Sequence, residues 1–135
     1  MVRTKLCGLG TEADVRAAVD AGADALGFIT DVDVDTPREI APDRAATLAA
    51  GAPPFVTTVA VTIPETVDDA VAVADRVEPD ALQIHGEFGP AAVREIRERA
   101  GVDVIVALGA DEPDRARELD GVADALLVDS LTAEG

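Results

Sequence analysis

The strongest constraint on the fold of this chain is the regular alternation of short apolar runs with longer amphipathic runs. Apolar runs of strand length occupy residues 3–7, 25–29, 55–61, 81–84, 104–107 and 125–129. Apolar residues at helical spacing fill the intervals, at residues 12–21, 42–50, 65–76, 90–100 and 112–120. This βαβαβαβαβαβ order predicts parallel strands joined by helical crossovers, in one α/β domain over residues 1–135.

Local signals agree with several of these helix boundaries. Thr11 followed by Asp14 predicts a capping box at the start of the first helix, and Asp111 is expected to cap the fifth helix. Prolines stand in the first turns of three predicted helices, where a missing N–H costs no hydrogen bond: Pro42, Pro90 and Pro113.

Two folds share this local pattern, the open doubly wound sheet and the closed eight-stranded (β/α)₈ barrel. Periodicity does not choose between them, because strand-to-strand intervals of this length suit both. In either fold the ligand lies at the carboxyl edge of the parallel strands. We therefore expect functional side chains at the ends of the strands.

Composition excludes several classes of partner. The net charge is −16, and acidic residues are spread along the chain, so we expect an acidic surface that repels nucleic acid and anionic membranes. Asp and Glu at this density, with Lys5 as the single lysine, suggest adaptation to high salt, where self-repulsion is screened. One histidine and one cysteine do not make a zinc site, so no metal is expected.

The compartment is inferred from what the chain contains. A single cysteine forms no internal disulfide, and residues 1–20 hold no long apolar run. We therefore expect neither a signal peptide nor a membrane span, and we assign the cytoplasm.

The first strand places two reactive groups on one face. Lys5 and Cys7 are two residues apart, so both side chains point the same way, and a nearby ammonium favours the thiolate form of a cysteine. A thiolate is a nucleophile and a proton acceptor. The alternative is that Cys7 only fills space, as many buried cysteines do.

Other candidate residues stand at or after later strands. Asp129 ends the sixth strand and is either a general acid or a residue of a loop turn or helix cap. His85 follows the fourth strand and shares a face with Gln83. It either contacts a ligand or is a histidine at the end of the sheet whose hydrogen bonds are satisfied within the protein. Arg38 either binds a carboxylate with its planar fork or is a solvated surface residue. Gly8-Leu9-Gly10 lacks the third glycine of a dinucleotide motif.

Six segments of the chain together resemble one enzyme family. They are TKLCG at residues 4–8, DAGADALGF at 20–28, PREI at 37–40 with Pro42 after it, PPFV at 53–56, LQIHG at 82–86 and LVDS at 127–130. In this order they resemble the motifs of phosphoribosylanthranilate isomerase. The acidic segment at residues 31–36 departs from the family pattern before Arg38.

The resemblance implies a (β/α)₈ barrel that performs an Amadori rearrangement of a phosphorylated small molecule without a cofactor. Asp129 would be the general acid that opens the ribose ring, and Cys7 the general base that removes the C2′ proton. Arg38 would bind the anthranilate carboxylate, while His85, Gln83 and Lys5 would line the substrate site. A homo-oligomer is a further possibility that the sequence leaves open.

Length is the largest departure from the family. A barrel needs eight strands and we count six, so we expect an incomplete barrel without the phosphate-binding loops of strands seven and eight. The glycine-rich loop after strand six would begin at about Gly135. Two alternatives remain: another barrel enzyme such as indole-glycerol-phosphate synthase, which depends on several lysines, and a non-catalytic, oligomerising or regulatory fragment.

Overall fold

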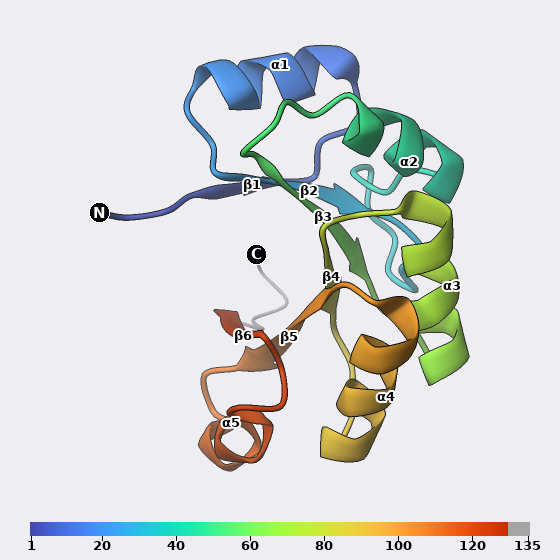
Figure 1. Ribbon diagram of the computed structural model, residues 1–135, viewed down its shortest axis with the longest axis vertical. Coiled ribbons are helices and arrows are strands. Elements are labelled where there is room, and N and C mark those ends of the chain that lie inside the picture. Colours follow the sequence, from blue (N-terminus) through green and yellow to red (C-terminus); the bar gives the residue numbers. More distant parts are fainter. Residues whose placement is uncertain (130–135) are drawn as a thin grey trace.

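The computed structural model describes residues 1–129, which form six strands and five helices in strict alternation (Figure 1). The strands are β1 (Lys5–Cys7), β2 (Ala25–Ile29), β3 (Thr57–Thr62), β4 (Ala81–Ile84), β5 (Asp103–Gly109) and β6 (Ala125–Asp129). The helices are α1 (Glu12–Asp20), α2 (Pro42–Ala50), α3 (Val67–Val77), α4 (Pro90–Ala100) and α5 (Pro113–Leu119). All eleven predicted elements are confirmed, with shifts at their ends. Ser130 of the LVDS motif and Gly135 lie outside the described residues.

Strand order distinguishes the two folds that the sequence allowed. Each strand pairs in parallel with the next one along the chain, in the order β1-β2-β3-β4-β5-β6. A doubly wound sheet reverses its order at a switch point, whereas a barrel does not. The helices follow one another around the convex side of the sheet (Figure 1). Over residues 1–129 the molecule is therefore an arc of a (β/α)₈ barrel, with β1 and β6 as its two edges.

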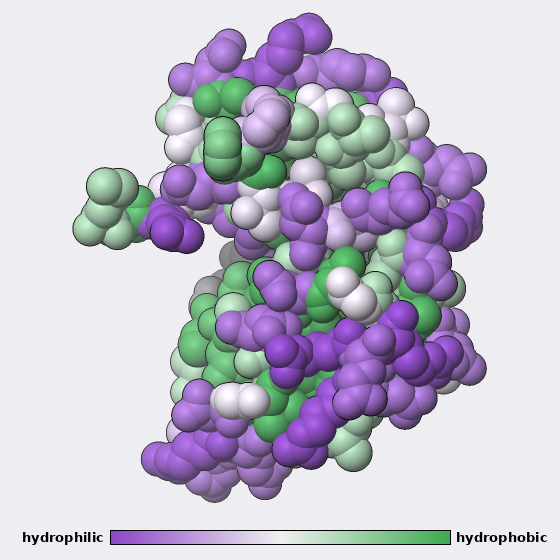
Figure 2. All heavy atoms as spheres, in the orientation of Figure 1, coloured by the Kyte–Doolittle hydropathy of each residue, from purple (hydrophilic) through white to green (hydrophobic). Residues whose placement is uncertain are grey.

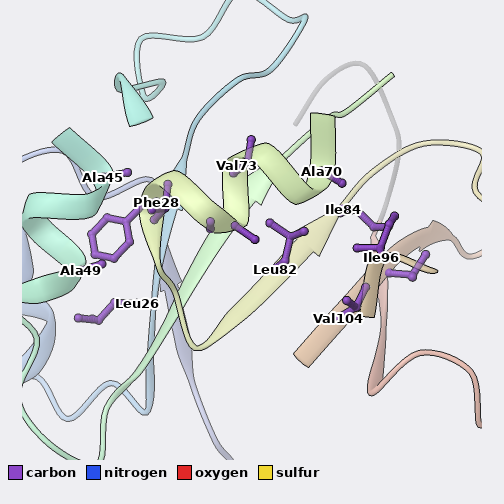
Figure 3. Packing of buried hydrophobic residues seen from close by; sticks show 14 of the residues in the cluster. Leu26, Phe28, Ala45, Ala49, Ala70, Val73, Leu82, Ile84, Ile96 and Val104 are labelled. Atoms are coloured by element: carbon purple, nitrogen blue, oxygen red, sulfur yellow. The ribbon is translucent and has the colours of Figure 1, made fainter. Parts of the chain in front are cut away.

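Alternating side chains divide the apolar residues into two layers. Those on the outer face of the sheet pack against the helices, and Leu26, Phe28 and Leu82 are completely buried there (Figure 3). A smaller cluster on the inner face contains Val59, Val61 and Ala81. Because the helices cover only the outer face, the inner face is the side on which polar groups can meet a ligand.

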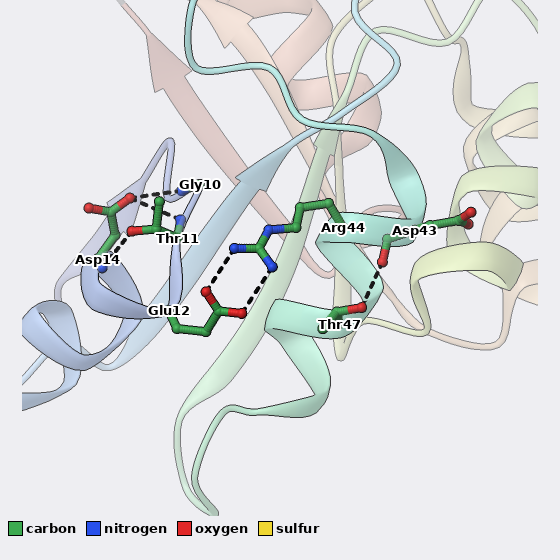
Figure 4. Close-up of polar contacts among 7 residues, drawn as sticks. All are labelled: Gly10, Thr11, Glu12, Asp14, Asp43, Arg44 and Thr47. Carbon is green, nitrogen blue, oxygen red and sulfur yellow. Dashed lines mark hydrogen bonds and ion pairs between the residues drawn. The ribbon is translucent and has the colours of Figure 1, made fainter.

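Three predicted details were wrong or incomplete. Asp111 does not cap α5, because Glu112 is the N-cap residue of that helix. Phe55 does not begin β3; its φ of 69° is left-handed, its side chain is fully exposed, and the strand starts at Thr57. Helix α3 starts at Val67 because Thr66 forms a capping box with Asp69. The capping box of α1, between Thr11 and Asp14, is confirmed (Figure 4).

An exposed ion pair connects the first two helices. Both guanidinium nitrogens of Arg44 on α2 donate to the carboxylate of Glu12 on α1, at 2.9 and 2.8 Å (Figure 4). The two-bond geometry fixes the orientation of the pair. Its contribution to stability is modest, since both side chains are solvated.

A carboxylate stands at the same place before each even-numbered strand. The tetrapeptides at residues 23–26, 79–82 and 123–126 read ADAL, PDAL and ADAL. The Asp in each accepts a hydrogen bond from a backbone N–H at the start of the preceding odd strand: Thr4 N to Asp24 at 2.7 Å, Thr58 N to Asp80 at 2.8 Å and Val104 N to Asp124 at 2.8 Å. These carboxylates hold neighbouring strands in register at their amino ends.

The outer surface seen in Figure 2 is largely hydrophilic. In Figure 2 hydrophilic residues cover much of the helical layer, and apolar residues show between them. No helix among the described residues is long and apolar enough to cross a membrane.

Asp80 provides a test of the strand clamps. Replacing Asp80 with Ala leaves the buried N–H and hydroxyl of Thr58 without their acceptor, so the free energy of unfolding should fall by about 1–3 kcal/mol. Urea denaturation measures the change. Asp75→Ala, on the exposed side of α3, removes the same charge and is the control. Equal stability of the two variants would show that the clamp is unimportant.

Salt dependence tests the meaning of the net charge. Screening shortens from about 10 Å at 0.1 M to about 3 Å at 1 M salt, which weakens repulsion among the 16 excess negative charges. We expect the melting temperature to rise steeply with KCl between 0.1 and 2 M. A flat melting temperature over this range, measured by circular dichroism, would contradict adaptation to salt.

Candidate active site

The inner face of the arc carries most of the candidate residues. Alternation along β1 and β4 puts Lys5, Cys7 and Gln83 on this face, and His85 follows directly after β4 with the same orientation. Asp129 is the last residue of β6 and pairs in register with Gly109 of β5. These residues come from two edge strands and one central strand. Because the sheet is curved, the inner faces of these three strands point toward the same space.

The thiol of Cys7 lies over a glycine of the neighbouring strand. Cys7 is paired in register with Gly27 of β2, and a Cβ added at Gly27 would lie 2.8 Å from the Cys7 sulfur. No real side chain tolerates such an approach, so only glycine leaves room for the thiol. Cys7 is exposed in the described arc, so it is not part of the packed core there.

Arg38 is brought to the same end of β1 by a folded loop. Ile40 N donates to Ile29 O at 2.9 Å, and Glu39 forms a parallel bridge with Ile29, so the segment runs beside the end of β2. A Cβ added at Gly8 would lie 2.8 Å from Cδ of Arg38, which shows that the arginine stem crosses the chain directly after Cys7. The structure therefore brings Arg38 next to the end of β1, although thirty residues separate Arg38 from Cys7 in the sequence.

Glu39 closes the acidic loop before Arg38. Its carboxylate accepts a hydrogen bond from the backbone N–H of Val32 at 3.2 Å. Thr36 accepts another from the backbone N–H of Arg38 at 3.3 Å. The departure from the family pattern at residues 31–36 is thus accommodated in a loop with its own internal contacts.

Gln83 and His85 form a pair at the end of β4. Their Nε2 atoms are 3.1 Å apart, Gln83 is buried and His85 is partly buried. Burial lowers the pKa of His85 below its ordinary value. Asp129 acts in the opposite direction, and Lys5 lowers that pKa further. The pKa of His85 therefore responds to Lys5 on β1 and to Asp129 on β6, so these three residues share one electrostatic environment.

Sequence reasoning missed the glycines that shape this site. Gly27 interrupts an apolar strand, and a glycine inside a strand often marks a close approach by another group. That signal was available but does not say which group approaches. Gly8, with φ of 85°, turns the chain away from β1 at the point where Arg38 crosses it.

Other hollows on the surface do not coincide with these residues. One cavity is lined by Arg97, Asp103 and Asp124. It lies at the amino ends of the strands, whereas the candidate residues lie at the carboxyl ends. In the part of the chain from 1 to 129, no group of three acidic, histidine or cysteine side chains is placed to hold a metal ion. The chemistry available at the carboxyl edge is that of a thiol and a carboxyl group, with cationic side chains beside the thiol.

Comparison with known proteins identifies related chains. The model of the N-(5'-phosphoribosyl)anthranilate (PRA) isomerase family matches residues 4–135. An N-(5'-phosphoribosyl)anthranilate isomerase of Halorubrum lacusprofundi is 50% identical over 135 residues, which are 100% of this chain and 63% of that relative. This chain thus spans less than two thirds of the relative's length.

Two solved structures of Thermotoga maritima proteins are similar to the arc. A phosphoribosyl anthranilate isomerase has a TM-score of 0.84 and 36% identity, and the match covers 100% of this chain and 64% of that one. A second structure, of monomers generated from the dimeric isomerase, has a TM-score of 0.79 and 32% identity over 99% of this chain and 68% of that one.

A double-mutant cycle tests the contact between Gly27 and Cys7. Gly27→Ala should lower the free energy of unfolding by about 1–3 kcal/mol, because the new methyl group overlaps the Cys7 sulfur. In a Cys7→Ala background the loss should be smaller, since the sulfur is gone. Gly10→Ala, whose added Cβ meets Ile40 at an ordinary 3.6 Å, is the control. An unchanged loss in the double variant would refute the contact.

Proposed function

The chain belongs to the N-(5'-phosphoribosyl)anthranilate isomerase family, and on that premise we propose that its carboxyl-edge site serves the isomerisation of N-(5-phosphoribosyl)anthranilate. The product is 1-(2-carboxyphenylamino)-1-deoxyribulose 5-phosphate. The observation that supports the proposal is that Cys7, His85 and Asp129 belong to the inner face of the arc, where the charges of Lys5 and Asp129 both act on His85.

Acid catalysis opens the sugar ring. Asp129 in its protonated form donates a proton to the ring oxygen of the ribose, while the anthranilate nitrogen supplies the electron pair that breaks the C1′–O bond. The result is a protonated Schiff base with a free hydroxyl group. Asp129 lies at the end of β6 and is partly buried, at the carboxyl edge where a substrate would meet it.

Base catalysis completes the rearrangement. The Cys7 thiolate removes the proton from C2′, and the electrons of that C–H bond move toward the positively charged nitrogen to give an enolamine. Tautomerisation of the enolamine gives the ketone. The substrate's own nitrogen is the electron sink in each step, so the reaction as proposed needs no cofactor.

Cationic groups near Cys7 give the site its affinity for an anionic substrate. Arg38 crosses the chain after Cys7 and is exposed, so its guanidinium is available for the anthranilate carboxylate. Lys5 shares the face of Cys7 and adds a second cationic group there. His85, partly buried, lines the space between β1 and β6, and the buried Gln83 contacts it from below.

Single substitutions test the acid and base. Cys7→Ala and Asp129→Asn should each lower kcat by at least about 10²-fold, the usual loss for removal of a general acid or base. Turnover is followed by the loss of substrate fluorescence. The assay uses residues 1–135 and, in parallel, a chimera extended with the remaining segment of the Halorubrum lacusprofundi relative. Asp75→Asn on α3 is the control, and near-wild-type turnover in either site variant would refute its assigned role.

We further propose that the protein forms a homo-oligomer through the loop before β3. Phe55 is fully exposed there beside Pro53 and Pro54, which line a hollow with alanines of α2. Exposed aromatic side chains are enriched at protein interfaces. Phe55→Ala should shift the mass measured by light scattering toward the monomer, whereas Val34→Ala, at another exposed apolar residue, should not. A monomeric wild-type chain would contradict the proposal.

We also assign the protein to the cytoplasm. Its single thiol needs no oxidising compartment, and its proposed partner is a small phosphorylated substrate rather than nucleic acid or membrane. Subcellular fractionation is the test, and recovery outside the cytoplasmic fraction would contradict the assignment.

A further inference from the structure

Gln83 is a buried polar residue in apolar surroundings. It is 4% exposed, and its register neighbours are Val61 on β3 and Ile105 on β5. Its amide Nε2 is 3.1 Å from Nε2 of His85. Its Oε1 is buried and has no hydrogen-bond partner among the described residues. His85 is therefore the group that orients this amide.

The direction of the hydrogen bond follows from counting donors. If the Gln83 amide donates to His85, one of its two N–H groups is used, and one N–H group and the carbonyl oxygen are left without a partner. If the amide were turned over, Oε1 would accept from the imidazole and both N–H groups would face apolar side chains. Buried N–H groups without partners are rarer than buried carbonyl oxygens without partners. The amide therefore donates, and Nε2 of His85 accepts.

An accepting Nε2 defines the state of the imidazole. A neutral imidazole with a lone pair on Nε2 carries its proton on Nδ1. Protonation of Nε2 would set two donors against each other at 3.1 Å. Burial and Lys5 also disfavour the cation, Asp129 favours it, and β3 and β5 face this region with apolar residues such as Val61 and Ile105.

We propose that Gln83 is a positioning residue that holds His85 as the neutral tautomer protonated on Nδ1. His85 then offers an N–H donor to an oxygen of the bound substrate at the barrel mouth. A neutral ring also adds no positive charge beside Asp129. The charge on His85 therefore bears directly on the residue that we propose as the general acid. The catalytic meaning rests on the proposed function, whereas the tautomer itself does not.

The chain is suited to a direct measurement because His85 is its one histidine. Long-range ¹H–¹⁵N correlation spectra of residues 1–135 report which ring nitrogen carries the proton. At pH 7 we expect a neutral ring with the proton on Nδ1. A ring protonated mainly on Nε2, or on both nitrogens, overturns the proposal even if no variant folds.

Two substitutions separate the donor from the volume of the side chain. Gln83→Met keeps length and burial but removes the donor, so the protonated fraction of Nε2 should rise from a minor to a major share. Gln83→Glu replaces the donor with an acceptor, so the pKa of His85 should rise by about one unit or more. Thr30→Val is the control. It removes a buried hydroxyl group, directly after β2, that has no hydrogen-bond partner among the described residues, and it should leave both signals unchanged.

The outcomes distinguish this proposal from the proposed function. An unchanged tautomer in Gln83→Met refutes the positioning role whatever the activity. If the spectra show the expected tautomers but the extended chimera has no turnover, Gln83 keeps its positioning role. The isomerase assignment is then refuted. With turnover, Gln83→Glu should lower kcat by about 10-fold or more and displace the acid limb of its pH profile, while KM changes less. A wild-type kcat profile would refute the link to Asp129.

Discussion

Parallel pairing of each strand with its successor is the constraint on which the rest of this structure depends. Because the order never reverses, every helical crossover lies on the same side of the sheet and the sheet curves into an arc. One face is then filled by helices and the other is left to the barrel interior. Asp24, Asp80 and Asp124 hold the pairs together at the amino ends, far from the candidate site. The stabilising carboxylates and the candidate site thus lie at opposite ends of the strands.

The site gathers positive charge in a protein that carries a large negative excess. An acidic surface would repel the proposed anionic substrate, so local cations are needed near the proposed reacting groups. Lys5 and Arg38 both lie beside Cys7, and glycines at positions 8 and 27 make room for the arginine stem and the thiol. A neutral His85 leaves the other edge, with Asp129, free of added positive charge. The two ends of the proposed reaction thereby have different electrostatic environments.

Much of this arrangement could be predicted from single residues. The strand-end positions of Cys7 and Asp129 followed from periodicity, whereas the roles proposed for them rest on the resemblance of their motifs to the isomerase family. The errors occurred where one backbone angle or one hydrogen bond decides a boundary. Phe55 continues an apolar run but adopts a left-handed φ, and Glu112 takes the cap position that Asp111 also suited. The clamps were missed because an Asp before a strand does not show which N–H it will bind.

Short-range rules account for the elements and for the face on which each side chain points. Alternation over two residues already puts Lys5 with Cys7 and Gln83 with His85, since a strand offers no other arrangement. The choice of a barrel arc over a doubly wound sheet depends instead on which strands become neighbours, a matter of long-range packing that local periodicity does not encode. The same holds for the meeting of Lys5, His85 and Asp129, because residues from β1, β4 and β6 share one electrostatic environment only after the sheet has curved.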